Sequence, residues 1–152
     1  MILESVEFAS IGVERRRYAV EEIRFSMAKL YRAFVVWSSL YGDAHEERER
    51  RELVDELTDL FTRCYLPRSM WLARETRERI EGFAEKSREL RTELSADIDG
   101  RGYEKARKRM SRRVSRKLGP MRKGVDRALA TEISGPKPSR WRGRPRRAQG
   151  LT

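Results

Sequence analysis

The side chains in this sequence that point most clearly to chemistry are the basic ones of its last third. Residues 101–152 carry 18 Lys and Arg against three Asp and Glu, whereas residues 1–100 carry 17 against 21. Guanidinium and ammonium groups segregated in this way favour a polyanionic partner, most simply nucleic acid. We therefore expect residues 101–152 to bind DNA or, as the second choice, RNA.

The most compact basic cluster lies near the C-terminal end of the chain. It comprises Arg140, Trp141, Arg142, Gly143, Arg144, Pro145, Arg146 and Arg147. Its four-residue core, Arg-Gly-Arg-Pro at 142–145, resembles the core of an AT-hook, a short DNA-binding motif. The resemblance implies that Arg142 and Arg144 enter the narrow, electronegative minor groove of A·T-rich DNA. Gly143 then allows a close approach and Pro145 keeps the chain extended, while the flanking arginines contact phosphates.

One residue of this cluster departs from the AT-hook pattern. Trp141 stands where AT-hooks usually have a proline or a basic residue. Its indole can stack on a sugar or on an exposed base, or meet the groove wall. A strict preference for A·T pairs is therefore a separate question from binding itself.

A second basic cluster lies on a helix that the sequence predicts at 103–118. One stripe of this helix is apolar, and it consists of Tyr103, Ala106, Met110, Val114 and Leu118. We expect phosphate contacts from the basic residues around it, which are Lys105, Lys108, Arg109, Arg112, Arg113 and Arg116. Two other interpretations stay open at this point. The helix can lie on an anionic membrane surface, or its cations can pair with carboxylates of the first 100 residues.

The sequence contains no pattern typical of an active site. His45 is the only histidine and stands beside Glu46 and Glu49 near a predicted helix start, where a surface position is expected. Cys64 falls on an apolar seam, as a buried inert thiol would. There is neither a P-loop nor a glycine-rich dinucleotide turn. We expect a protein that is not an enzyme and that has no cofactor and no metal site.

The elements that position these clusters are predicted to be long helices. Apolar residues follow one another at alternating steps of three and four, a coiled-coil-like seam that predicts one helix from about 4 to 41. The seam consists of Val20, Ile23, Met27, Leu30, Phe34, Trp37 and Tyr41, continued backwards by Val6, Ala9 and Val13. Gly42 is expected to end this helix in the left-handed conformation, and Asp43 to cap the next one.

Two further helices are predicted after Asp43. The first, at about 43–65, has a seam at Val54, Leu57, Phe61 and Cys64, widened by Leu53 and Leu60. Its charged run at 46–52 is expected to be solvated. Leu66-Pro67 should end it, because proline disfavours the helical conformation in the preceding residue. The next helix should begin at Pro67 or Ser69 and end in the glycine-containing turn at 97–102.

The basic fourth helix should continue beyond residue 118. Gly119-Pro120 interrupts it, but an apolar stripe resumes at Met121, Val125, Leu129 and Ile133, so the helix should kink or restart with Pro120 in its first turn. No strand pattern is present, and periodicity stops at Ser134. We predict an all-α antiparallel bundle of three long helices plus a basic fourth helix with a kinked extension at 1–133, and a disordered basic tail at 134–152.

These observations predict a small non-enzymatic nucleic-acid-binding protein of the cytoplasm, located in the nucleoid if DNA is the partner. The alternative is a helical scaffold or adaptor that binds another protein, with a basic arm for a membrane surface. The predicted first helix is longer than the second and would overhang it, so a homodimer through the N-terminal helix is expected. No apolar run approaches the length of a transmembrane segment.

Overall fold

A computed structural model describes residues 2–134 of the chain, with side chains from Ser10 onward. The described residues form helices joined by short connections, and no strand occurs among them, as the sequence predicts. The elements are α1 (Ile2–Ser39), α2 (Ala44–Arg68), the short 3₁₀ helix η1 (Ser69–Trp71), α3 (Arg74–Arg101), α4 (Tyr103–Arg113), the π-helical turn η2 (Val114–Leu118) and α5 (Gly119–Ser134). The tail was predicted to begin at residue 134, but Ser134 still belongs to α5, and the remaining tail residues, 135–152, lie outside the described residues.

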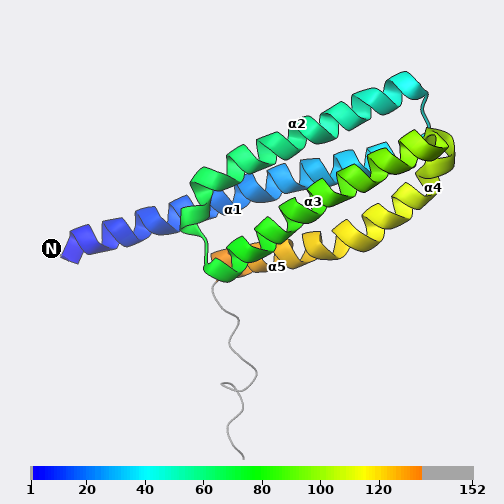
Figure 1. The fold of residues 1–152 in the computed structure, drawn as a ribbon. Helices are drawn as coiled ribbons and strands as arrows, with labels where there is room; N and C mark the ends of the chain where they lie inside the picture. Colours follow the sequence, from blue (N-terminus) through cyan, green and yellow to red (C-terminus); the bar gives the residue numbers. More distant parts are fainter. Residues whose placement is uncertain (1, 135–152) are drawn as a thin grey trace, which may run out of the picture.

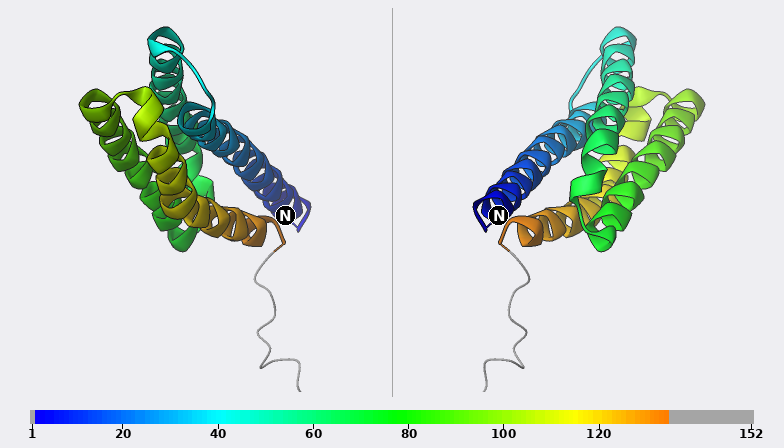
Figure 2. Two further views of the ribbon diagram at one scale, coloured as in Figure 1. Left: turned by 90° about the vertical axis from the view of Figure 1, so that its right-hand side faces the viewer. Right: turned by 90° about the vertical axis from the view of Figure 1, so that its left-hand side faces the viewer.

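The helices form an antiparallel bundle of four rods (Figures 1 and 2). The segments α4, η2 and α5 follow one another directly and act as the fourth rod, which runs back along α1 and α3. A single glycine, Gly102, separates α3 from α4, and its φ of 84° is the only positive φ in the described chain. A residue without Cβ adopts that conformation at little cost, so the two helices can join without a loop.

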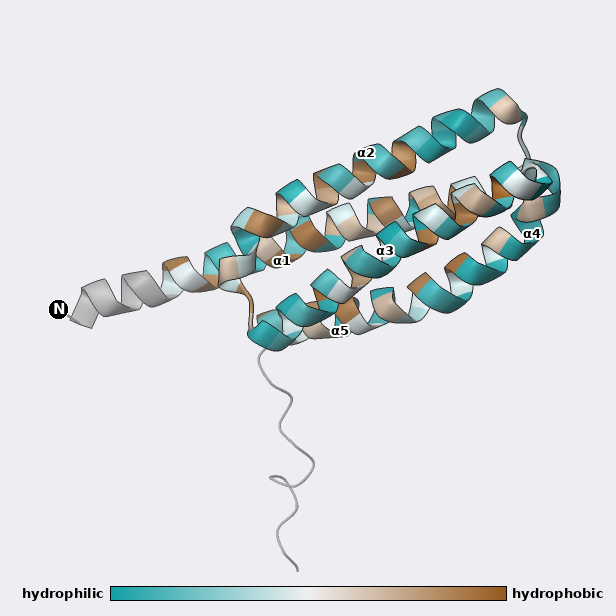
Figure 3. Ribbon diagram, in the orientation of Figure 1, coloured by the Kyte–Doolittle hydropathy of each residue, from teal (hydrophilic) through white to brown (hydrophobic). Residues whose placement is uncertain are grey.

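The predicted seam of α1 forms the centre of the hydrophobic core. Its members Val20, Ile23, Met27, Leu30, Phe34 and Trp37 are all completely buried. They pack against apolar residues of the other three rods, such as Phe61 and Phe83, and the apolar sides of the helices turn toward their neighbours (Figure 3). Tyr41, predicted to extend the seam, is instead 67% exposed, because the helix has already ended at Ser39.

The connection between α1 and α2 differs from the predicted glycine cap. Gly42 does not adopt a positive φ, and α1 ends at Ser39, three residues before Gly42. Arg50 of α2 closes this connection, since its guanidinium donates to the backbone carbonyls of Leu40 and Tyr41. The predicted cap of α2 is confirmed, because the Asp43 carboxylate accepts a hydrogen bond of 2.8 Å from the backbone N–H of Glu46.

The connection between α2 and α3 also differs from the prediction. Pro67 lies inside α2, which continues to Arg68, and α3 begins only at Arg74, after η1. A proline here costs little because the helix ends one residue later, so few of its hydrogen bonds are lost. The Arg68 side chain donates to the carbonyl of Cys64 and so satisfies one of the last acceptors of the helix.

A buried carboxylate holds together the end of the bundle where α1 meets α2. Glu47, predicted to be solvated with its charged neighbours, is buried and accepts hydrogen bonds from the Trp37 indole at 3.1 Å and from Arg51 at 2.9 Å. Arg51 also contacts Asp99 of α3. Tyr103, the first residue of α4, donates to the carbonyl of Trp37. All four rods are therefore tied together at this end by polar contacts.

A second buried carboxylate holds the opposite end. Glu132 of α5 accepts hydrogen bonds from the backbone N–H of Ala73 at 2.7 Å and from the Thr76 hydroxyl at 2.8 Å, and lies 3.7 Å from Arg16 of α1. Ala73 occupies the N-cap of α3 and has no capping side chain of its own. Glu132 thus supplies from another helix the acceptor that a capping box supplies locally.

Tyr65 of α2 gives the bundle a dependence on alkaline pH. Its ring is buried, and its hydroxyl donates to Glu81 of α3 at 3.0 Å. Burial, followed by the hydrogen bond to Glu81, raises the pKa of Tyr65 above its ordinary value. The folded protein therefore keeps this proton at pH values above about 10, where an unfolded tyrosine loses it. Its contribution to stability is complete below pH 10 and is lost as pH rises beyond that value.

We therefore expect the free energy of unfolding to fall less between about pH 9 and pH 11 in the Tyr65→Phe variant than in the parent protein. Urea unfolding followed by circular dichroism at both pH values measures this difference. Tyr18→Phe is the matched control, because it removes a phenol that is 57% exposed. Equal alkaline losses in the two variants would contradict the assignment to Tyr65.

Candidate nucleic-acid interface

Seven basic side chains lie along the outer side of the fourth rod. All are exposed, and their spacing places them on one side of the helix. We call this set the basic ridge, and it consists of Lys105, Lys108, Arg109, Arg112, Arg116, Lys123 and Arg127.

The ridge points outward because the opposite side of the rod is apolar and packs into the core. The buried residues there are Tyr103, Ala106, Met110, Val114, Leu118, Val125 and Leu129. The flanks of the rod contact the neighbouring helices. Toward α1, Arg107 lies over the Tyr41 ring at 4.4 Å, and toward α3, Lys117 forms an ion pair with Glu93 at 2.7 Å. The only side left to solvent is the one that carries the ridge.

The π-helical turn η2 keeps the apolar stripe facing inward. Buried residues follow one another at steps of four from Met110 through Val114 to Leu118. In a regular α-helix such steps rotate gradually away from one side, whereas the wider turn of a π-helix accommodates them. The backbone N–H of Gly119 bonds to the carbonyl of Val114, five residues back. Pro120, which has no N–H, follows directly in the first turn of α5, as predicted.

No carboxylate of the described residues neutralises the ridge. Within the described part of the chain, none of the seven side chains forms an ion pair or a hydrogen bond. Residues 103–134 contain 11 Lys and Arg against three Asp and Glu. Those three are engaged elsewhere, since Glu104 accepts from Tyr41, Asp126 pairs with Arg24 and Arg122, and Glu132 caps α3. Arginines of α3, by contrast, do form ion pairs with carboxylates, as Arg91 does with Asp55 at 2.8 Å.

The length of the ridge suits a nucleic-acid duplex. Lys105 and Arg127 are 22 residues apart in sequence, which corresponds to about 33 Å along a helix. One turn of B-form DNA is about 34 Å long. Cations along such a length can therefore follow phosphates over about one turn of the duplex.

The structure brings together most, but not all, of the predicted phosphate-binding residues. Lys105, Lys108, Arg109, Arg112 and Arg116 lie on the ridge. Arg113 lies off it, half-buried, and lines a hollow with Glu93 and Asp97 of α3. The predicted residues of the tail, Arg140 to Arg147, lie outside the described residues.

Lys123 and Arg127 belong to the ridge but were not predicted from the sequence. Treating Gly119-Pro120 as an interruption separated them from the basic helix. Their steps of seven and four from Arg116 continue the pattern of α4, so continuing the stripe across the proline would have identified them.

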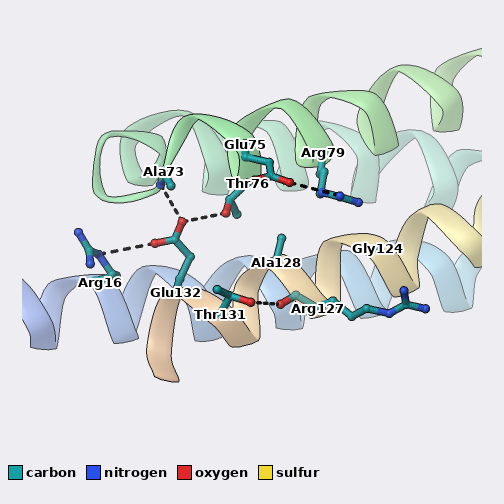
Figure 4. A pocket seen from close by; sticks show the side chains of 10 residues that line it. All are labelled: Arg16, Ala73, Glu75, Thr76, Arg79, Gly124, Arg127, Ala128, Thr131 and Glu132. Carbon is teal, nitrogen blue, oxygen red and sulfur yellow. Dashed lines mark hydrogen bonds and ion pairs between the residues drawn. The ribbon is translucent and has the colours of Figure 1, made fainter. Parts of the chain in front are cut away.

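A hollow of about 390 Å³ adjoins the C-terminal end of the ridge, between α3 and α5 (Figure 4). Arg127 of the ridge and Arg79 of α3 both line it, and Arg79 also contacts Glu75 at 3.4 Å. Gly124 leaves room for the Arg79 side chain here, since a Cβ at this position would lie 3.3 Å from its guanidinium. Arg16, Glu75 and Glu132 line it as well, so carboxylates offset much of the positive charge of this hollow.

The described residues contain no group of three or more His, Cys, Asp or Glu side chains arranged to hold a metal ion. His45 contacts Glu49 on the exposed side of α2, and Cys64 is half-buried. None of the described helices combines the length and apolar character needed to cross a bilayer. Comparison of the chain with protein-family models, with curated proteins and with solved structures found no match in any of the three.

Proposed function

We propose that this protein binds nucleic acid without catalysing a reaction, and that the basic ridge supplies the phosphate contacts. The observation that carries the proposal is the row of seven exposed cations that no described carboxylate neutralises. Ion pairing with the rest of the bundle is the principal alternative for a basic helix. Among the 11 basic residues of the fourth rod, the described chain shows such a pair only for Lys117, while Arg122 pairs with Asp126 of its own helix.

The tail has a second role in this proposal. Arg142 and Arg144 enter the minor groove, as the resemblance of residues 142–145 to an AT-hook implies, while the ridge neutralises phosphates nearby. The last described residue, Ser134, lies about two turns beyond Arg127, so the C-terminal end of α5 is close to the ridge. The proposed location is the cytoplasm, and DNA as the partner would place the protein in the nucleoid. A homodimer through the N-terminal helix would present two ridges.

Fluorescence anisotropy with A·T-rich and G·C-rich duplexes, across a series of salt concentrations, tests both roles. Removing three ridge cations as Arg109→Ala/Arg112→Ala/Arg116→Ala should weaken binding by about 10- to 100-fold and reduce the salt slope by about 2 to 3. The variant should fold, because alanine is a strong helix former on an exposed surface. Arg142→Ala/Arg144→Ala should instead remove the preference for the A·T-rich duplex.

The matched control removes the same charge elsewhere. Arg17, Arg48 and Arg63 are exposed and lie on α1 and α2, away from the ridge. The triple alanine variant at these positions should bind nearly as the parent does. An equal loss in this control would mean that only net charge matters and would contradict the ridge. Absence of binding at about 0.15 M salt would contradict the proposed function as a whole.

The second candidate function is a helical scaffold that binds another protein. One observation favours it, namely that several large apolar side chains of α1 and α2 are exposed rather than packed in the core. A partner chain retained by the protein after removal of nucleic acid would support this function. The exposed apolar residues are also the starting point of the inference that follows.

A further inference from the structure

The outer side of the α1–α2 pair carries large apolar residues that the bundle does not cover. Leu53 and Leu60, predicted to widen the buried seam of α2, are instead among the exposed residues. We call the following set the outer apolar face, with the exposed fraction of each residue: Ile11 (47%), Tyr18 (57%), Phe25 (61%) and Leu60 (46%).

These residues lie on two neighbouring helices, three on α1 and one on α2. Ile11, Tyr18 and Phe25 are seven residues apart, so they lie on one side of α1, away from its buried seam. Tyr18 lies under the Arg68 guanidinium at 5.5 Å, close to the end of α2. Because α2 runs antiparallel to α1 from there, Phe25 lies level with Leu60.

The N-terminal part of α1 extends past the bundle. The helix has 38 residues, about 57 Å, against 25 residues and about 37 Å for α2. Its first turns project beyond the other helices (Figures 1 and 2). Ile11, near this part, is 47% exposed, and a helical end without packing is only marginally stable in water.

We infer that a second copy of the chain covers the outer apolar face, with the two α1 helices antiparallel and crossing at Tyr18. Ile11 and Phe25 are equally far from Tyr18, so Ile11 of each copy then lies against Phe25 and Leu60 of the other. A single two-fold operation therefore covers the whole face and both projecting ends, as an isologous interface requires.

The charges along α1 favour the antiparallel orientation. Residues 1–14 contain three Glu and no Lys or Arg, whereas residues 24–32 contain three Lys and Arg and no Asp or Glu. Antiparallel crossing at Tyr18 places these two stretches side by side, and also places Arg15 of one copy opposite Glu22 of the other. A parallel arrangement would place each acidic stretch against itself. Opposite charges at the rim set the orientation of an interface more than its strength.

This inference specifies the homodimer included in the proposed function, and its test does not involve nucleic acid. Light scattering and sedimentation equilibrium of the full chain should give twice the monomer mass of 17.9 kDa at tens of micromolar. Phe25→Glu should raise the dissociation constant by about 30-fold or more, because it puts a charge at the centre of the apolar contact. Leu40→Glu adds the same charge at an exposed position away from the face and should leave the dimer intact.

Disulfide crosslinking tests the orientation. With Cys64→Ser as the background, Tyr18→Cys should crosslink under mild oxidation, because the two copies meet there. Ile11→Cys and Phe25→Cys should each stay uncrosslinked alone and should crosslink when the two variants are mixed. A monomer at all concentrations, or a dimer unaffected by Phe25→Glu, would overturn the inference. Crosslinking of Ile11→Cys to itself would overturn the antiparallel arrangement. Circular dichroism verifies that each variant is folded.

Discussion

Replacing Trp37 by alanine is expected to cost about 3 to 5 kcal/mol of the free energy of unfolding. Trp37 is completely buried in the core, at the end of the bundle where α1 meets α2, and packs against Phe34, with ring centroids 6.2 Å apart. The substitution leaves a cavity that the neighbouring helices cannot fill, and it removes the indole donor from the buried Glu47 carboxylate. Such a loss is a large part of the total stability of a domain of this size.

The two contributions of Trp37 can be separated by experiment. Trp37→Phe retains most of the ring but not the N–H group, so it should cost only about 1 to 2 kcal/mol from the lost hydrogen bond plus a small packing defect. Denaturant unfolding followed by circular dichroism measures both variants. Tyr41→Ala, at a position that is 67% exposed, serves as the surface control. A Trp37→Ala loss no larger than that of the control would refute the central role of this residue.

Replacing Glu132 by alanine should produce the second large loss of stability, about 3 kcal/mol. The change removes one acceptor from two donors at the start of α3, the Ala73 N–H and the Thr76 hydroxyl. It also leaves Arg16 without its carboxylate at the junction of α1, α3 and α5. Because Ala73 cannot cap α3 itself, the first turn of that helix should fray, and hydrogen exchange of its amides should accelerate.

Glu132→Gln is the matched control for this prediction. The amide oxygen can still accept from Ala73 and Thr76, and only the charge opposite the partly exposed Arg16 is lost. Since ion pairs with a solvated partner contribute little, we expect this variant to cost about 1 kcal/mol or less. If Gln and Ala destabilised the protein equally, the charge rather than the cap would be responsible.

Periodicity was sufficient to predict the helices and the core but not their ends. The six consecutive seam residues from Val20 to Trp37 are all buried, because a regular repeat of apolar residues leaves one choice of inward side. The ends depend on contacts between distant residues. Arg50 reaches back to the carbonyl of Leu40 and closes the first connection without the expected glycine conformation, and no local pattern around Gly42 reveals this contact.

Buried carboxylates were the part of the fold that local sequence concealed. Glu47 stands in a run of charged residues that reads as a solvated surface, yet it is buried because Trp37 and Arg51 converge on it. Glu132 caps a helix that begins 58 residues earlier. The ridge was predicted in part, since the spacing from Lys105 to Arg116 is visible in the sequence and only its continuation past Pro120 was missed.

The π-helical turn contains one residue more than a regular α-helix needs to connect its two flanks. The residues that face inward from Met110 onward are Val114, Leu118, Met121 and Val125. Without Ser115 they would follow one another at steps of four, three, three and four, which suit an ordinary α-helix. Such a deletion, however, would place the Pro120 ring in a regular helix, where it collides with a carbonyl of the preceding turn. Pro120 therefore fits this rod only when the extra residue of the π-helical turn precedes it. Deletion of Ser115 is therefore tolerable when Pro120 is replaced by another residue at the same time, and costly when Pro120 is kept.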